Sequence, residues 1–151
     1  MTTERNYFGN DEQWCKHCGT GRIRAGTLRK LNRLREIRNK ATSLSSAYRC
    51  PDYNDSVSST GRHGPHTTGG AVDIPCSGQE AREMLFAGVL VSAVEAGLLT
   101  VEQAQEWLPQ MLANGFTGIG VNQRGDHGKR FVHFDDLPAG GTGPRPWVWS
   151  Y

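Results

Sequence analysis

The spacing of apolar positions predicts two helices in the first two thirds of the chain. Residues 27–40 form the first, with Thr27 as its N-cap, because apolar side chains recur every three residues between basic ones. These apolar positions are Leu28, Leu31, Leu34 and Ile37. Residues 79–96 predict the second helix, and Gly97 supplies its C-terminal stop.

A third helix is predicted to begin at Thr100. Thr100 and Gln103 have the spacing of a capping box, in which each side chain satisfies a backbone N–H of the other residue. An apolar face follows, and we expect Pro109 to kink the helix and residues 114–115 to end it. The segment from Thr100 is therefore predicted to be a helix with a well-defined start.

The last third of the chain predicts strands. Residues 131–135 alternate strictly between their two faces, and residues 118–121 and 147–149 are short and rich in β-branched or aromatic residues. Residues 125–129 would form the turn between the first two strands.

The middle of the chain is predicted as a short β-like segment, a loop and a buried strand, at residues 42–48, 52–70 and 70–74. Together, this order of elements predicts an α+β fold with a mostly antiparallel sheet and helices on one side of it. A chain of 151 residues predicts a single domain, 1–151.

Composition excludes several classes of protein. Charged residues make up 21% and hydrophobic residues 36%, which fits neither a disordered chain nor a coiled coil nor a membrane protein, and the 19 glycines predict many turns. The N-terminal stretch lacks an apolar segment, and no window approaches the roughly 20 apolar residues of a membrane span. We therefore expect a monomer made in the cytoplasm without an export signal and with no membrane span.

Charge is concentrated in one segment. Residues 22–40 contain eight basic residues and only Glu36 as an acidic one, whereas the net charge of the chain is +2. Such a run favours polyanions such as nucleic acid, wall polymers or a lipid surface, and a solvated helix face is the plainer interpretation.

Four cysteines raise the question of a structural metal. Cys15 and Cys18 form a C-x-x-C pair followed by glycine, which is typical of half a zinc knuckle. Cys50 and Cys76 would complete a four-thiolate structural zinc site, His17 is a further candidate ligand, and free thiols are the alternative.

Two segments carry residues that suit catalysis. His66 and Asp73 lie seven positions apart across a glycine pair that lets the backbone turn sharply, and His133 interrupts an otherwise apolar strand. Two histidines and one carboxylate are a ligand set of catalytic zinc, with a fourth position left for water. We therefore predict a zinc site made by His66, Asp73 and His133, and His63, which lies close to His66 in the sequence, is a competing candidate ligand.

Three segments in this order resemble a known family. They are Ser46-Ala47-Tyr48-Arg49, then His66 to Asp73 with Gly69 and Ala71 between them, then His133-Phe134-Asp135. The chain is similar here to the zinc peptidases that include D-alanyl-D-alanine carboxypeptidases, L-alanyl-D-glutamate endolysins of phages and the Hedgehog fold. It departs from that pattern at Gly64, where the family has a serine.

The resemblance implies a peptidase that hydrolyses an amide bond in the peptide part of bacterial peptidoglycan after release from the cell, of the L-Ala–D-Glu or D-Ala–D-Ala type. Arg49 would hold a substrate carboxylate or the developing oxyanion. A histidine side chain titrates close to neutral pH, so His127 is the first choice as general base and Asp126 the second. Asp135 would orient His133. The alternative is a non-catalytic zinc module that binds nucleic acid or a protein partner, although nucleic acid leaves the His66 and Asp73 pair unexplained.

Overall fold

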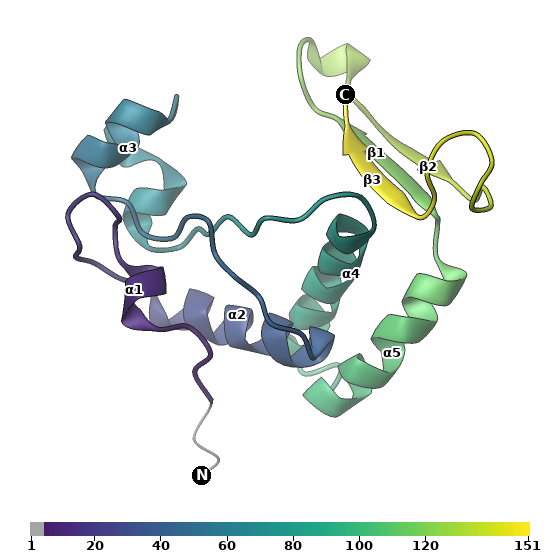
Figure 1. Cartoon of the computed structure of the whole chain (residues 1–151), viewed down its shortest axis with the longest axis horizontal. Coiled ribbons are helices and arrows are strands. Elements are labelled where there is room, and N and C mark those ends of the chain that lie inside the picture. The colour runs from purple at the N-terminus through teal and green to yellow at the C-terminus, as the bar shows by residue number, and fades with distance from the viewer. Residues whose placement is uncertain (1–4) are drawn as a thin grey trace. The chain divides into compact units, whose positions relative to one another are not determined.

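The chain falls into two compact units. A computed structural model describes residues 5–151, and the first unit extends to Pro75 while the second begins at Cys76 (Figure 1). The α+β class is confirmed, since the described residues contain five α-helices and three strands. The single domain expected for residues 1–151 stays a prediction.

The first unit is built from short helical elements around one longer helix. The predicted helix of residues 27–40 is confirmed as α2, but Thr27 is not its N-cap: the helix begins at Ala25 after the N-cap Arg24, and it ends where Asn39 adopts a left-handed conformation with φ of 49°. The elements are α1 (Asn10–Gln13), α2 (Ala25–Arg38), α3 (Pro51–Val57), η1 (Gly61–His63) and η2 (Pro65–Thr68).

A small apolar core holds the first unit together. Its buried members come from the N-terminal segment, α2 and the extended segment after α2, and they are Phe8, Ile23, Leu31 and Ala47. Val72 and Ile74 pack against this core from residues 70–74, so the residue between them, Asp73, is turned outward. The alternation along this segment thus exposes the predicted metal ligand.

Two predictions for the middle of the chain are wrong in part. Residues 51–57 form the helix α3 and not the start of a loop. Pro51 suits the first helical position, and the side chain that this helix buries is the polar Asn54, so no apolar pattern marks the helix in the sequence. The expected buried strand at residues 70–74 is reduced to one isolated antiparallel bridge between Ser46 and Asp73, and Asp73 is exposed.

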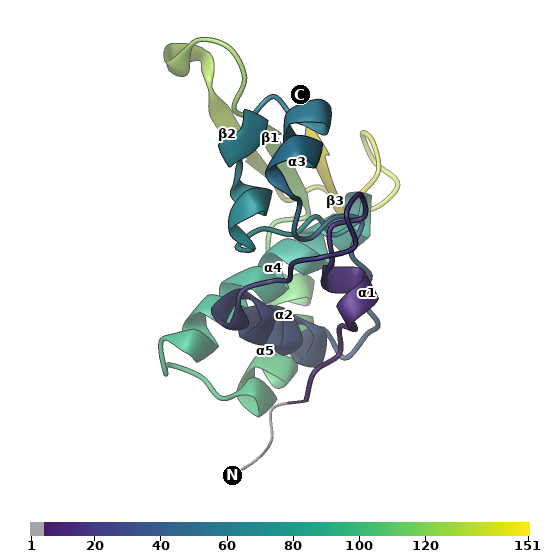
Figure 2. The same ribbon diagram turned by 90° about the vertical axis from the view of Figure 1, so that its left-hand side faces the viewer.

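The second unit contains a helix pair and a sheet. Helices α4 and α5 pack side by side, as Figures 1 and 2 both show, and α4 also packs against the last strand. The elements are α4 (Gly78–Glu95), α5 (Val101–Asn114), β1 (Gly118–Asn122), η3 (His127–Lys129), β2 (Phe131–Asp135) and β3 (Trp147–Ser150).

The three-stranded sheet is mixed, so the expectation of a mostly antiparallel sheet is wrong. The strand order is β2-β1-β3, with β2 antiparallel and β3 parallel to the central β1. The chain leaves β2 beside Gly118 and crosses to the other edge of β1, where Trp147 pairs with the same glycine. Because β3 starts at the end of the sheet where β1 starts, the two strands must run in the same direction.

The helix pair follows its predicted signals closely. The side chain of Thr100 accepts a hydrogen bond from the Gln103 N–H, and the Gln103 side chain accepts one from the Thr100 N–H, so the capping box is confirmed. Helix α5 continues through Pro109 and ends before Gly115. No helix in residues 5–151 combines the length and the apolar character that crossing a lipid bilayer requires.

Candidate functional site

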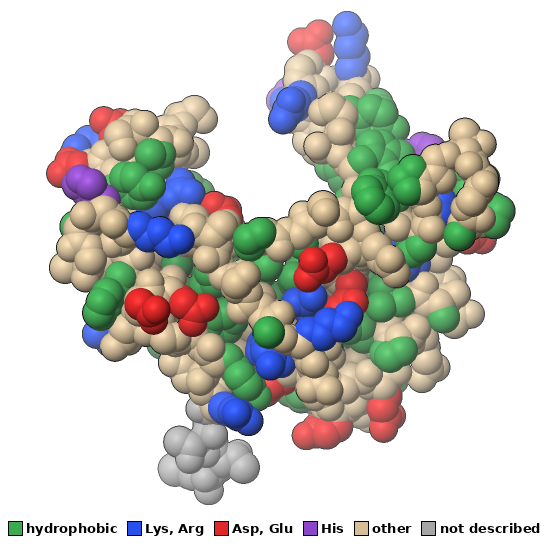
Figure 3. All heavy atoms as spheres, viewed as in Figure 1, with side chains coloured by type: hydrophobic (Ala, Val, Ile, Leu, Met, Phe, Trp, Pro, Cys, Tyr) green, Lys and Arg blue, Asp and Glu red, His purple; other side chains and the backbone are tan. Residues whose placement is uncertain are grey.

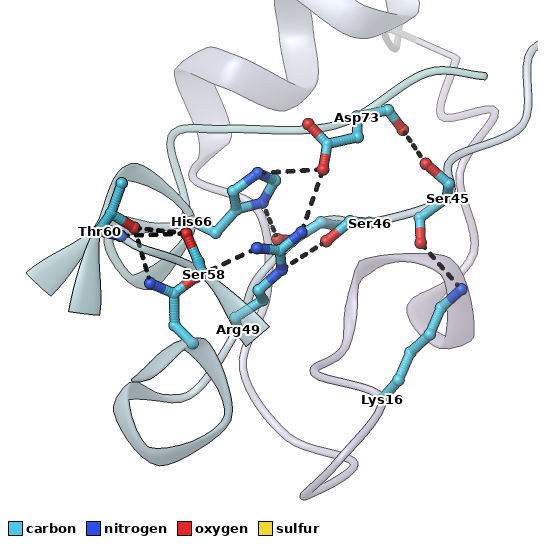
Figure 4. Close-up of polar contacts among 10 residues, drawn as sticks. Lys16, Ser45, Ser46, Arg49, Ser58, Thr60, His66 and Asp73 are labelled. Carbon is cyan, nitrogen blue, oxygen red and sulfur yellow. Dashed lines mark hydrogen bonds and ion pairs between the residues drawn. The ribbon is translucent and has the colours of Figure 1, made fainter. Parts of the chain in front are cut away.

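An extended segment, residues 45–49, organises the polar cluster of the first unit (Figure 4). On one side, backbone hydrogen bonds join Ser45 and Ser46 to Asp73 over 2.9 Å each. On the other side, the Arg49 N–H donates to the carbonyl of His66 at 3.2 Å. His66 and Asp73 are therefore both anchored to the same segment, although seven positions separate them in the chain.

The ring of His66 is fixed in one orientation. Its Nδ1 lies 2.7 Å from the carbonyl oxygen of Ala47, and since a carbonyl can only accept, Nδ1 carries the proton. The other nitrogen, Nε2, lies 3.3 Å from Oδ2 of Asp73. A neutral His66 would direct the lone pair of Nε2 at a carboxylate oxygen, which is repulsive unless a proton or a metal cation lies between them.

The separation of these two atoms suits a metal ion. Zinc bonds to nitrogen and oxygen of about 2.0–2.2 Å at a tetrahedral angle place the two ligand atoms about 3.4 Å apart. The observed 3.3 Å between His66 Nε2 and Asp73 Oδ2 meets this requirement. The side chain of Asp73 is 52% exposed, so the pair is open to a cation and a substrate from solvent.

Gly69 makes the turn between the two side chains possible. It has φ of 73°, a left-handed conformation that glycine adopts without strain. A Cβ atom at this position would lie 2.8 Å from the carbonyl oxygen of Arg22, so the close approach of the two backbones also requires glycine. The sequence-based interpretation of the glycine pair as a sharp turn is confirmed at Gly69.

Arg49 is held by three partners in this cluster. Its Nε donates to Ser46 Oγ at 2.8 Å, its Nη1 to Asn54 Oδ1 at 3.2 Å and its Nη2 to Asp73 Oδ2 at 3.1 Å (Figure 4). A guanidinium has five N–H groups, so two remain for a ligand. Arg49 therefore fixes the Asp73 carboxylate and also keeps donors for an anionic group.

Asn54 was missed by the sequence analysis. Its side chain is fully buried and also donates to Thr60 Oγ1 and to the carbonyl of Gly61. A buried amide of this kind connects α3 and η1 to Arg49. The sequence signal for Asn54 was its position three residues after Pro51, in the first turn of a helix. This signal could be used only after α3 had been recognised as a helix.

His133 lies in the second unit within its own polar cluster. Its Nε2 is 2.9 Å from Asp135 Oδ2, which confirms that the two side chains share one face of the sheet. Arg145 makes two further hydrogen bonds to Asp135, at 2.8 and 2.6 Å, and this partner was missed by the sequence analysis. The Arg145 guanidinium holds the pKa of Asp135 well below its usual range, and His133 and the Leu137 N–H act in the same direction.

Two glycines of β1 lack a side chain and so leave space for the polar cluster around His133. A Cβ atom at Gly118 would meet the carboxylate of Asp135, and one at Gly120 would lie 2.7 Å from the indole of Trp149. Trp149 in turn packs against the His133 ring, with 5.3 Å between ring centroids. Hydrophobic side chains also gather along the strands, as Figure 3 shows, so the polar cluster stands out from an otherwise apolar sheet.

The two candidate general bases lie in the connection between β1 and β2. Asp126 immediately precedes η3 and His127 begins it, and both side chains are exposed. The Asp126 carboxylate is 3.9 Å from the ammonium of Lys129. Both residues thus lie in the turn that was predicted for them, and their assignment as general base stays a prediction.

Three of the four cysteines come together in the first unit. The Sγ atoms of Cys15, Cys18 and Cys50 all lie within 4.8 Å of one another, as a metal site requires. Among the described residues Cys76 is not part of this group, so the four-cysteine set is corrected to three. Cys76 is exposed and begins the second unit, just before α4, whereas the three clustered cysteines belong to the first unit.

The thiol of Cys15 lies in a polarised position. Burial raises its pKa, but backbone N–H groups, beginning with that of Cys50 and continuing with those of Cys18 and His17, stabilise the thiolate and bring the pKa to about 7. The Cys50 N–H lies 3.3 Å from the Cys15 sulfur. This environment suits a thiolate that binds a metal.

The basic segment is only partly available to an anionic surface. Arg38 is 5% exposed and donates to Thr42 Oγ1, so its charge is turned into the unit. Arg35 lies over the ring of Tyr7 with 5.0 Å to the centroid. The sequence suggested that the basic residues lie on one exposed helix face. The guanidinium groups of Arg35 and Arg38 instead make contacts that stabilise the first unit.

Comparison of the chain with protein-family models, with curated proteins and with solved structures finds no match.

Proposed function

We propose that this chain is a zinc-dependent peptidase that hydrolyses an amide bond in the peptide part of bacterial peptidoglycan. One observation carries the proposal: His66 and Asp73 present a nitrogen and an oxygen at ligand separation, with the proton of His66 held on the opposite ring nitrogen. His133 is the third ligand of the proposal, and this assignment comes from the sequence. The Hedgehog-type peptidase fold is part of the same proposal.

The residues divide the chemistry between them. Bound zinc would supply a Lewis acid that polarises the scissile carbonyl and makes water nucleophilic near neutral pH. His127, or Asp126 in its place, takes a proton from the attacking water and passes it to the leaving amine as the C–N bond breaks. Arg49 binds the substrate carboxylate or the developing oxyanion through the two N–H groups that its neighbours leave free.

Metal binding and lysis test the proposal together. We expect purified protein to hold zinc, and His66→Ala to lose one equivalent of metal together with lysis of cell-wall substrate. His63→Ala is the matched control, because His63 is an exposed histidine in the neighbouring η1. If His66→Ala kept both metal and lysis, or if His63→Ala lost them equally, the proposal would be wrong.

His133→Ala tests the third ligand separately. We expect this variant to keep its circular dichroism spectrum and to lose lysis. Retained lysis would remove His133 from the site. Mass spectrometry of the digested peptidoglycan then identifies the bond, because cleavage of an L-Ala–D-Glu linkage and of a D-Ala–D-Ala linkage release products of different mass.

The second candidate is a non-catalytic zinc module, and the cysteine cluster favours it. Such a module would bind nucleic acid or a protein through the cluster and the basic helix α2 and would not require His66. Salt-dependent DNA binding by both wild type and His66→Ala, without lysis by either, would support it over the peptidase.

A further inference from the structure

The turn that carries Cys15, His17 and Cys18 lies against the start of α3, where Cys50 is the N-cap residue. The turn is closed by two backbone hydrogen bonds, from Cys15 N–H to Thr20 and from Gly19 N–H to Cys15, at 2.9 and 2.7 Å. It directs two cysteine side chains and one histidine side chain toward the same neighbour, Cys50.

We propose that Cys15, Cys18, Cys50 and His17 form a structural zinc site, separate from His66 and Asp73. Three cysteines and one histidine are a complete ligand set for structural zinc. Compared with the set expected from the sequence, His17 takes the place of Cys76.

Distances support His17 as the fourth ligand. Zinc–sulfur bonds of about 2.3 Å and a zinc–nitrogen bond of about 2.0–2.1 Å at a tetrahedral angle place sulfur and nitrogen about 3.6 Å apart. Nδ1 of His17 lies 3.6 Å from Sγ of Cys50. His17 is exposed and its ring stacks on that of Tyr53, with 5.7 Å between the centroids. A rotation toward the two other sulfur atoms would exchange this surface contact for the metal and displace no core side chain.

The zinc site would fix the position of Arg49, the residue that precedes Cys50 in the chain. Cys50 follows Arg49 directly, and the Cys50 N–H points at the Cys15 sulfur. A second tie joins the same turn to the extended segment, since the Lys16 ammonium donates to the Ser45 carbonyl at 3.1 Å (Figure 4). Zinc would therefore hold the backbone that orients Arg49 toward Asp73, which makes it a positioning site without a part in chemistry.

Cobalt substitution in the full chain tests the site, because thiolate ligands give Co²⁺ a near-ultraviolet charge-transfer absorption that histidine and carboxylate ligands do not give. We expect the wild type and Cys76→Ser to show the absorption of three thiolates, and Cys18→Ser to lose one of these contributions. His66→Ala should keep the full band, which separates this site from the proposed catalytic one.

His17→Ala tests the fourth ligand. We expect the thiolate band to remain, the visible cobalt bands to shift, and the apparent dissociation constant for zinc to rise at least about tenfold, equivalent to about 1.4 kcal/mol. An unchanged visible spectrum and affinity would overturn His17 as a ligand.

Two results would overturn the whole site. The first is a cobalt-loaded wild type without a thiolate band, and the second is an equal loss in Cys76→Ser and Cys18→Ser. His17 and Cys18 are exposed, so their substitutions should leave the fold intact, and the wild-type spectrum is decisive without any variant.

Discussion

Single residues of the first unit show that polar contacts, not only apolar packing, hold the candidate site. Arg49 links a backbone segment, a helix and a carboxylate through Ser46, Asn54 and Asp73. Its side chain is only 16% exposed, so these contacts are partly shielded from water. These three contacts depend on the charge, the planar shape and the length of the Arg49 side chain.

Arg49→Lys should therefore be destabilising although it keeps the charge. An ammonium cannot make three divergent hydrogen bonds from one plane, and the buried Asn54 would lose a partner. We expect the free energy of unfolding to fall by about 1–3 kcal/mol, measured by urea denaturation. Arg62→Lys is the control, since the Arg62 pair with Asp52 is exposed and the substitution should leave the free energy of unfolding nearly unchanged. Equal effects of the two substitutions would contradict the prediction.

The Asp135 carboxylate should make stability depend on pH in a defined direction. Arg145 lowers the pKa of Asp135 in the folded state. The stabilising contribution of the Asp135 carboxylate is therefore fully present above its unfolded-state pKa of about 3.9, and this contribution is lost as the pH falls from there toward the folded-state pKa. The stability difference between wild type and Asp135→Asn should be largest above about pH 5 and should narrow toward pH 2. Urea denaturation with a chelator present measures this difference.

Asp126→Asn is the matched control for that series. Its carboxylate is exposed and its nearest cation is 3.9 Å away, so we expect almost no difference from wild type at any pH. A difference for Asp135→Asn that stayed constant from pH 6 to pH 2 would contradict the assigned pairing with Arg145.

Residue positions in the candidate site were predictable where chain geometry alone determines them. The meeting of His66 and Asp73 follows from a turn at Gly69, and the shared face of His133 and Asp135 follows from strand alternation. Arg145 could not be found in this way, and Asn54 could be found only after α3 had been recognised as a helix. An amide or a guanidinium has no distinctive spacing, and only the folded backbone brings it to its partner.

At the scale of elements, hydrophobic periodicity detected the three helices that bury apolar faces and missed the two short helices, α1 and α3, whose buried residues are polar. Helices α2, α4 and α5 follow their apolar patterns, and α5 also has its predicted cap. Helix α3 buries Asn54 and is held by polar contacts to Arg49 and Thr60, so its sequence reads as a polar loop. Periodicity is informative only where burial is apolar.

Strand positions were predictable in the second unit, but strand direction was not. Alternation located β2, and β-branched or aromatic residues located β1 and β3, whereas the parallel pairing of β3 depends on the path of residues 136–146 between two edges of the sheet. A loop of that length can return on either side. Pairing is therefore set by tertiary contacts, such as the packing of Trp147 at Gly78 of α4.

The capping box of α5 is the element whose contribution can be measured most directly. Thr100→Ala removes the acceptor for the Gln103 N–H, which lies 3.1 Å from the hydroxyl. We expect a loss of about 1 kcal/mol in the free energy of unfolding, and Thr100→Ser should retain most of the wild-type value because it keeps the hydroxyl. Equal losses in both variants would show that the methyl group, not the cap, is responsible.

For the whole molecule, the division into two units separates the residues that the peptidase proposal requires. His66, Asp73 and Arg49 belong to the first unit, and His133 with both candidate bases belongs to the second. The proposed activity should therefore need residues of both units, whereas the cysteine cluster needs only residues of the first.

Zinc should stabilise the protein even when the proposed catalytic ligands are removed. In a His66→Ala background, free zinc at about 100 times its dissociation constant should raise the free energy of unfolding by about 2.7 kcal/mol. Chemical denaturation with and without a chelator measures this gain. Adding Cys18→Ser should abolish it and adding Cys76→Ser should not, so a gain that survived Cys18→Ser would place the stabilising metal elsewhere.

The adjacency of Arg49 and Cys50 has a pharmacological consequence. An alkylating agent that modified one of the clustered sulfur atoms would strain the backbone next to the Arg49 guanidinium, and under the peptidase proposal it would inhibit lysis although the cysteine cluster is separate from His66 and Asp73. Bound zinc would protect against such a reagent, because a coordinated thiolate is a poorer nucleophile than a free one. Under the peptidase proposal, a screen for inhibitors would therefore select covalent sulfur-directed compounds with zinc-depleted protein and not with zinc-loaded protein.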